Sequence, residues 1–520
     1  MWNSLEIKNQ NLKDSLNPRW FAWGLLFITV MGVYMRFPGL FANRFSADEA
    51  LFGMWARYIA TWRDPFLLNV PTPVDKPPLL FYLQALFYPL QGPVEWAARL
   101  PNFFASIVLI PLVGRMAFQM TNKNQKRAWL AAAIVAFSPL AIQFSATAFT
   151  DPLLTFFVTV ALWCAIRPQK SSSLIYSSGL WLGIALLVKY QAVLFLPLVW
   201  LFEWGKFAPN RLNQISQIRQ IPKKDIIRWL LHFTGCIGLL LLWDALSGGG
   251  IDLVSQQTSA YGGFSFIPLA LFLPRFWAWM KLFLYVPGWG FALICALSFI
   301  IFFDWKRKCD LGYFSRIIVF VFSYMLLHIM LQSLLEPRYA LPLVPIFALG
   351  VANLPLRRPE WLSKPAWAWI RTDDDIKQGI QLLIVVVVCA IFLVQAMPAR
   401  MGNYPVGGRP GNDEGAAAIA QTILEQPYGT VLYDHWYSWH WRYHFFYKGV
   451  YVEWFDQTEE LLENLEAFYD PAAEDKRYLA LRVDDRFAEE IVSALDAAGY
   501  RLEPVAHEGR IELYVISQTK

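Results

Sequence analysis

The stretch AWLAAAIVAFSPLAIQFSATAFTDPLLTFFVTVALWCAI, residues 128–166, decides the fold class of this chain. Its single formally charged residue, Asp151, lies between two apolar runs. Because about 20 apolar residues cross the hydrocarbon core of a bilayer as a helix, each run is typical of a membrane span. We therefore predict two spans, 128–147 and 150–166, joined by a very short connection that holds Asp151.

Apolar runs of this kind recur along most of the chain. Of its 520 residues, 56% are hydrophobic and only 16% are charged, against about 25% in soluble domains. This composition excludes a soluble multidomain protein. The first run follows a basic leader without a small-residue cleavage site, so we expect a retained anchor. We predict eleven spans, at 20–37, 100–120, 128–147, 150–166, 174–188, 190–204, 228–246, 288–304, 314–334, 340–356 and 378–398.

Lysine and arginine gather in alternate loops between these spans. If the N-terminus is cytoplasmic, five successive inner loops are basic, as expected for loops that are retained inside. We therefore expect a multi-pass protein of the inner (cytoplasmic) membrane with its C-terminal part outside. The basic loops lie at 123–127, 167–170, 206–228, 306–308 and 357–371.

Two long outer loops, 38–99 and 247–287, follow from this orientation. Both contain amphipathic or apolar segments that are too short or too interrupted by proline to span comfortably. Such segments are typical of helices that lie at the membrane interface. We expect these helices at 48–62, 77–90 and 274–285.

The character of the chain changes after Pro398. Residues 1–399 have 34 basic and 19 acidic side chains, whereas residues 400–520 have 11 basic and 21 acidic ones. The predicted fold is thus an α-helical polytopic membrane module, 1–399, followed by an extracytoplasmic soluble α/β domain, 400–520. In that domain, residue patterns predict strands at 429–435, 449–455, 477–483 and 510–517 and helices at 413–426, 457–469 and 486–498.

Ionisable residues stand at the outer edges of several predicted spans. Charges near apolar segments are costly unless they are paired or solvated, so each is a candidate for function. A lysine that extends its ammonium to the interface is an alternative for Lys189, and a helix N-cap is one for Asp48. Together the residues could form a cleft for a ligand with an anionic head and an apolar tail. The candidates are Asp48, Glu49, Asp75, Lys76, Asp151, Lys189, Glu336, Arg338 and Tyr339.

The same residues carry a resemblance to a known family. RFSADEALFGMWARYI has an acidic pair at the start of an outer-loop helix, and VDKPPLLFYLQALFYPLQGPVEWAARLPN has a K-P-P stretch before an A-R-L-P span start. FTDPLLTFF with LGIALLVKYQAVLFLP, and then EPRYALPLVPIFAL, complete four motifs in order. From about residue 37 to 352, the chain resembles GT-C-fold glycosyltransferases that use polyprenyl-phosphate sugars, in the branch of lipid A aminoarabinose transferases and protein O-mannosyltransferases.

The resemblance implies an inverting transfer of a sugar from a lipid phosphate. It implies that Asp48 is the catalytic base and that Asp151 assists at the acceptor or sugar site. Lys76 and Arg338, with Lys189, would neutralise the phosphate, and Tyr339 would hydrogen-bond it. Glu49 would lie in the same substrate-binding cleft as a helix or loop partner.

Expected partners are a polyprenyl-phosphate-sugar donor, a lipid, glycan or protein acceptor, and membrane lipids, but no nucleic acid. No P-loop or Rossmann fingerprint is present. No cofactor is expected, although a divalent cation at Asp48, Glu49 and Asp151 is an alternative, because distant oligosaccharyltransferases use paired outer-loop acids in this way. A transporter or flippase, or a noncatalytic scaffold, remains a competing class of function; transporters place their charges near the midplane and often contain repeats.

The segment DHWYSWHWRYHFFYKG, residues 434–449, has no match in that resemblance. His440 and His444 would need a helix to share a metal ion, and a strand and loop packed on the membrane surface is the alternative for this segment, which also contains His435. Its aromatic side chains, Trp439 and Trp441 among them, could instead stack on an acceptor glycan.

Overall fold

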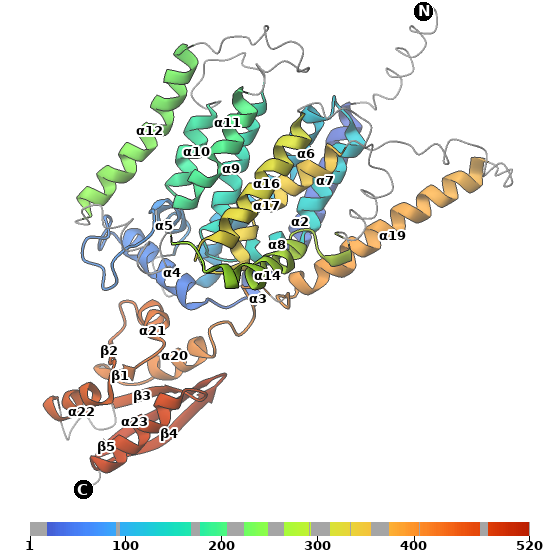
Figure 1. The fold of residues 1–520 in the computed structure, drawn as a ribbon. Coiled ribbons are helices and arrows are strands. Elements are labelled where there is room, and N and C mark those ends of the chain that lie inside the picture. Colours follow the sequence, from blue (N-terminus) through green and yellow to red (C-terminus); the bar gives the residue numbers. More distant parts are fainter. Residues whose placement is uncertain are drawn as a thin grey trace, which may run out of the picture.

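The computed structural model describes residues 18–89, 94–167, 177–204, 223–247, 265–290, 292, 312–332, 334–354, 374–404, 406–468 and 477–518. Its N-terminal part is a bundle of helices, and its C-terminal part contains a five-stranded sheet (Figure 1). Short helices within residues 39–85 and 272–285 lie at the end of the bundle that faces the sheet (Figure 1).

The helical part contains long apolar helices and several shorter ones. Its elements are α2 (Pro18–Arg36), α3 (Gly39–Ala42), α4 (Ala47–Ala60), α5 (Leu79–Ala85), α6 (Glu95–Met120), α7 (Gln125–Phe137), α8 (Pro139–Ser145), α9 (Asp151–Ile166), α10 (Ser178–Leu186), η2 (Tyr190–Phe195), α11 (Leu196–Trp204), α12 (Lys223–Leu246), η4 (Leu269–Leu271), α14 (Phe272–Tyr285), α16 (Tyr313–Met330), η5 (Pro337–Ala340), α17 (Leu343–Ala352) and α19 (Asp374–Arg400).

Among the described residues, four helices are long and apolar enough to cross a membrane, or five if α7 and α8 form one bent span. Several other predicted spans are helices of only 9 to 16 residues, such as α9, α10 and α17. The predicted number of eleven is therefore not confirmed. The span expected at 288–304 and most of the basic inner loops lie almost wholly outside the described residues.

A buried arginine donates hydrogen bonds to the free backbone carbonyl groups at the break between α7 and α8. The axes of these two helices differ by 53°. Pro139 has no N–H, so the carbonyl of Val135 cannot receive its usual helical hydrogen bond. Arg36 donates instead to the carbonyl oxygens of Val135 and Ala136, at 2.8 and 2.7 Å, and to Ser106 Oγ at 2.8 Å. The last residue of α2 thus ties α6 to the bend.

We expect Arg36→Met to lower the free energy of unfolding by about 2–4 kcal/mol, since each buried polar group left without a partner costs about 1–3 kcal/mol. Thermal unfolding of the detergent-purified protein measures this change. Arg115→Met, at an exposed position of α6, is the matched control. Equal melting temperatures for the two variants would contradict this account of the bend.

The predicted interfacial helices correspond to α4, α5 and α14. Contrary to a simple interfacial position, α4 is buried from Glu49 to Ile59. The reason is that a helix of the C-terminal part, α21 (Ser438–His444), packs on it. Tyr88 donates to the Tyr443 hydroxyl at 3.0 Å, and Arg57 lies 4.7 Å from the ring centre of Phe446.

The C-terminal sheet has the order β2-β1-β3-β5-β4. Strand β1 is parallel to β2 and β3, whereas β5 is antiparallel to β3 and β4. The strands are β1 (Thr430–Asp434), β2 (Val450–Trp454), β3 (Arg477–Arg482), β4 (Tyr500–Glu508) and β5 (Ile511–Gln518), and the other helices are α20 (Ala416–Leu424), α22 (Thr458–Ala467) and α23 (Arg486–Ala497).

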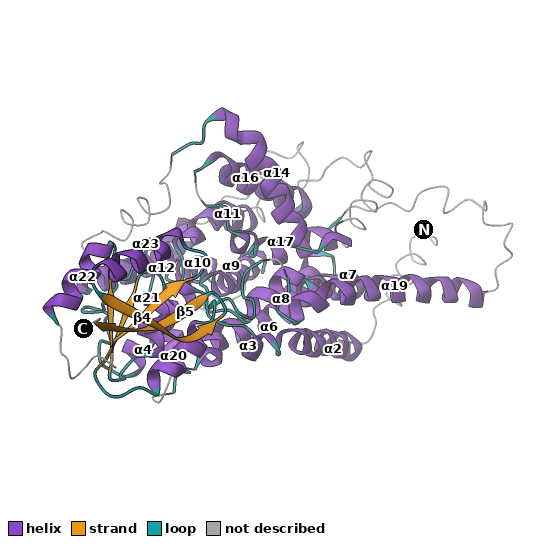
Figure 2. Ribbon diagram, turned by 90° about the horizontal axis from the view of Figure 1, so that it is seen from below, coloured by secondary structure: helices purple, strands orange, loops and turns teal. Residues whose placement is uncertain are grey.

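Side chains alternate across this sheet, as the period of a strand requires. Leu432 and Ala480 face a core with α20 and α21, while Tyr433 and Leu479 face a second core with α22 and α23. Helices therefore flank the sheet (Figure 2). The four predicted strands and three predicted helices are confirmed, whereas α21 and β4 were not predicted.

Candidate functional site

Asp48 and Arg338 form an ion pair at the end of the bundle. Asp48 is the second residue of α4, and its Oδ2 lies 3.1 Å from Nη1 of Arg338, which belongs to η5. The N-cap of α4 is Ser46, so the alternative that Asp48 serves only as an N-cap is wrong. The Asp48 side chain is 35% exposed and that of Arg338 is 14% exposed, so a ligand can reach the carboxylate.

A second ion pair joins Asp151 and Lys189, whose Oδ1 and Nζ atoms are 2.7 Å apart. Asp151 is 1% exposed and begins α9, where the helix dipole favours a negative charge. Lys189 lies between α10 and η2, with its Nζ 4.7 Å from the ring centre of Tyr339. Burial lowers the pKa of Lys189 to about 8, and the Asp151 carboxylate opposes that shift.

The two ion pairs are neighbours because the segment before Asp151 contacts Arg338, and the residue after Arg338 contacts Lys189. Phe149 lies under the guanidinium of Arg338, at 4.6 Å, two residues before Asp151. Tyr339 follows Arg338 and contacts Lys189. Asn102 holds the segment before Asp151 through its Nδ2, which donates to the carbonyl oxygens of Thr147 and Phe149, both at 2.7 Å.

Lys76, in the K-P-P segment, lies near the Asp151–Lys189 ion pair. The Leu79 N–H donates to the Leu187 carbonyl at 3.1 Å, which holds the segment against the end of α10. Lys76 pairs with Asp75 and lies near enough to Lys189 for its charge to lower the pKa of that lysine further. Arg338 and Lys76 both lie near enough to Lys189 for their charges to lower its pKa, so the three sequence-predicted cations are neighbours. Glu336 adds a carboxylate 3.9 Å from Arg338 Nε.

Glu49 is directed into the protein. Its Oε2 accepts from the backbone N–H and the hydroxyl of Ser46, at 3.0 and 3.1 Å, and its Oε1 accepts from the Ala148 N–H at 2.7 Å. These contacts tie the start of α4 to the segment that precedes Asp151. In the part of the chain that the structure describes, no three His, Cys, Asp or Glu side chains are grouped to hold a metal ion.

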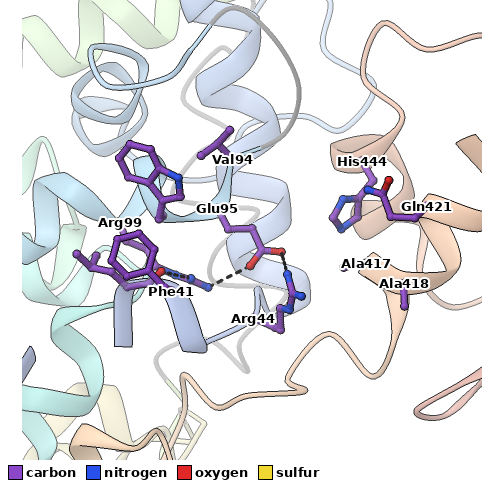
Figure 3. A pocket seen from close by; sticks show the side chains of 11 residues that line it. Phe41, Arg44, Val94, Glu95, Arg99, Ala417, Ala418, Gln421 and His444 are labelled. Atoms are coloured by element: carbon purple, nitrogen blue, oxygen red, sulfur yellow. Dashed lines mark hydrogen bonds and ion pairs between the residues drawn. The ribbon is translucent and has the colours of Figure 1, made fainter. Parts of the chain in front are cut away.

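Arg99, in the A-R-L-P motif, is a structural residue to which the sequence analysis assigned no role. It is 1% exposed, donates to the carbonyl oxygens of Leu40 and Asn43 at 3.1 and 2.8 Å, and lies 4.0 Å from Glu49. Glu95 pairs with Arg99 at 3.6 Å and with Arg44 at 3.9 Å (Figure 3). An arginine directly before a predicted apolar span was the available signal.

These charges line a cavity of about 440 Å³ between α3, the start of α6, and the helices α20 and α21. His444 forms part of the opposite wall (Figure 3). Burial lowers the pKa of His444 to about 3 and also lowers the pKa of His440, whose Nε2 lies 3.3 Å from the Phe45 carbonyl oxygen. The expectation of a strand and loop here is wrong, because residues 438–444 form a helix.

Comparisons with known proteins agree with the predicted resemblance. Residues 75–209 match the family described as "Dolichyl-phosphate-mannose-protein mannosyltransferase". Two Bacillus subtilis (strain 168) proteins are similar: "Putative mannosyltransferase YycA", 27% identical over 37% of this chain, and "Putative mannosyltransferase YkcB", 29% identical over 25% of it. The matches cover 26% and 18% of those proteins, so the chain spans about a quarter of their length or less.

The fold matches a solved structure over nearly the whole chain. ArnT from Cupriavidus metallidurans bound to undecaprenyl phosphate has a TM-score of 0.58 at 14% identity, covering 95% of this chain and 98% of that one. ArnT in the apo state gives 0.59, with 95% and 97% covered. The chain is accordingly a multi-pass membrane protein whose resemblance to the GT-C-fold glycosyltransferases, expected from four motifs, is confirmed.

Proposed function

We propose that this protein is an inverting glycosyltransferase that moves a sugar from a polyprenyl-phosphate carrier to a lipid, glycan or protein acceptor. The observation that carries the proposal is the juxtaposition of the Asp48–Arg338 and Asp151–Lys189 pairs. One partly exposed carboxylate stands there beside cations suited to a phosphate. The similarity of residues 75–209 to a family of lipid-phosphate-dependent mannosyltransferases supports the same class of reaction.

The reaction follows from the chemistry of these groups. Asp48 accepts the proton of an acceptor hydroxyl or amine, and the acceptor atom bonds to the anomeric carbon from the face opposite the phosphate. The bond between that carbon and the phosphate oxygen breaks, and its electron pair stays with the lipid phosphate. Arg338, Lys189 and Lys76 stabilise the charge that develops on this leaving group, so the proposal needs no divalent cation.

Donor binding requires an exchange of partners. Arg338 is paired with Asp48 in the free protein, and a donor phosphate would compete for its guanidinium. Binding of the donor would thus free the Asp48 carboxylate to accept a hydrogen bond from the acceptor hydroxyl when the acceptor arrives.

We also propose that the reaction takes place at the outer face of the cytoplasmic membrane. The support is the basic character of the predicted inner loops, together with the position of the site at the end of the bundle near the C-terminal sheet (Figure 1). The charges lie at this one end, which argues against a transporter with a site at the midplane.

Purified protein in liposomes, supplied with a labelled polyprenyl-phosphate sugar and an acceptor fraction of a bacterial envelope, tests the activity. We expect label in the acceptor and an equal amount of free polyprenyl phosphate. Protein-free liposomes are the control. Movement of labelled lipid between leaflets without any transfer would replace the proposal with a flippase.

A further inference from the structure

A cavity of about 540 Å³ lies between the first outer loop and the C-terminal part. Its size falls within the range of about 300–1,000 Å³ that is usual for small-molecule sites. Three indole side chains line it, from Trp436, Trp439 and Trp454, and we call it the tryptophan pocket. Thr72 and Ala47 of the outer loop close its other side.

Two of the three tryptophans do not serve a hydrophobic core. Trp436 is 54% exposed and Trp454 is 46% exposed, while Trp439 is half-buried and packs against the core of the helical part. Trp441, two residues after Trp439, is instead fully buried and stacks on Phe445. Large aromatic side chains gathered at an accessible cavity are typical of a binding site, since burying them in the core would otherwise be favourable.

Polar side chains line the same pocket. Arg442 lines the pocket from α21, and its Nη1 lies 3.4 Å from Thr72 Oγ1 across the junction. The Trp454 indole N–H donates to the His435 carbonyl at 3.2 Å, and Arg482 lies 4.6 Å from the ring centre of Trp436. These contacts hold two of the indoles in fixed orientations at the rim of the cavity.

This combination matches the surface of a sugar. A pyranose ring presents C–H bonds on its faces, which pack on indole, and hydroxyl groups at its edge, which hydrogen-bond to arginine, histidine and serine side chains. A purely apolar ligand would not need the polar Arg442 and Ser438 side chains that line the same pocket. The lining therefore favours a saccharide over a lipid tail.

The pocket also lies beside the proposed base. Ala47, one of its lining residues, directly precedes Asp48 at the start of α4. We propose that the tryptophan pocket binds a saccharide portion of the acceptor and presents the acceptor hydroxyl to Asp48. This inference rests on the proposed function and names its acceptor class: an acceptor that contains sugar, whether the sugar is attached to lipid, to protein or to further sugar.

Saturation-transfer NMR with mannotriose and chitotriose as probes tests binding separately from transfer. We expect saturation of the sugar C–H protons by the wild-type protein for at least one trisaccharide, and its loss in the Trp436→Ala/Trp454→Ala double variant. Trp62→Ala is the matched control, because Trp62 is 82% exposed on the same outer loop and does not line the pocket. All variants should melt at the wild-type temperature, since the replaced side chains are exposed.

In the transfer assay, Trp436→Ala and Trp454→Ala should each raise the acceptor KM about tenfold, with kcat and the donor KM unchanged. Failure of all proteins to transfer sugar while the trisaccharide still binds at the pocket would overturn the proposed function and leave the saccharide site. Three results would overturn the saccharide site. The first is that neither trisaccharide binds, and the second is that binding is undiminished in the double variant. The third is that added phospholipid or peptide is saturated and the trisaccharides are not.

Discussion

Asp48→Asn is expected to reduce kcat for sugar transfer by about 10²–10⁴-fold, the usual contribution of a general base. Asparagine keeps the size of the side chain but has no basic oxygen to accept the acceptor proton. The fold should change little, because Ser46 and Glu49 maintain the start of α4 through their own hydrogen bonds. Loss of a partly exposed ion pair costs at most about 1 kcal/mol.

Initial rates at saturating donor and acceptor measure this effect, with melting temperature recorded for each variant. Glu489→Gln, an exposed carboxylate in the first turn of α23, is the matched control and should retain full activity. Transfer by Asp48→Asn at a rate near that of the wild type would remove Asp48 from the role of base.

Lys189→Met is expected to lower the free energy of unfolding by about 3–5 kcal/mol and to abolish measurable transfer. The loss of stability follows because Asp151 would remain buried without its cationic partner. The loss of transfer follows because a cation at the lipid phosphate disappears. Thermal unfolding and single-turnover transfer measure the two effects on the same preparation.

A double variant separates these two effects. Asp151→Leu combined with Lys189→Met removes both charges, so most of the stability should return, since an apolar pair often replaces a buried ion pair without loss. Transfer should not return, because no cation is restored. Recovery of both stability and transfer would reduce Lys189 and Asp151 to a structural pair.

Several parts of the fold could be predicted because their signals are local. The strands at 430–434 and 477–482 are short runs that are buried along nearly their whole length, and α23 has one apolar face, so neighbouring residues suffice to identify them. Strand β4 was missed because it contains Pro504, charged side chains and an irregular register near Ala506, all of which are tolerated at the edge of a sheet. Helix α21 is short, and its aromatic residues show no simple period.

One signal in the candidate site was available in the sequence but not used. Ser46 and Glu49 are spaced as in a capping box, S-x-x-E, which predicts that Glu49 serves the helix start and that Asp48 does not. The function of Asp48 as a base and the roles of Lys76, Arg338 and Tyr339 stay predictions.

The sequence by itself determined the membrane character of the chain, the change to an α/β part after Pro398, and the set of ionisable residues at one end of the spans. Only the tertiary structure decided that Asp48 pairs with Arg338, that Asp151 pairs with Lys189, and that α21 covers α4 beside a tryptophan pocket. The reason is physical: hydrophobic periodicity is read over neighbouring residues, whereas Asp48 and Arg338 are 290 positions apart and meet only when the bundle packs.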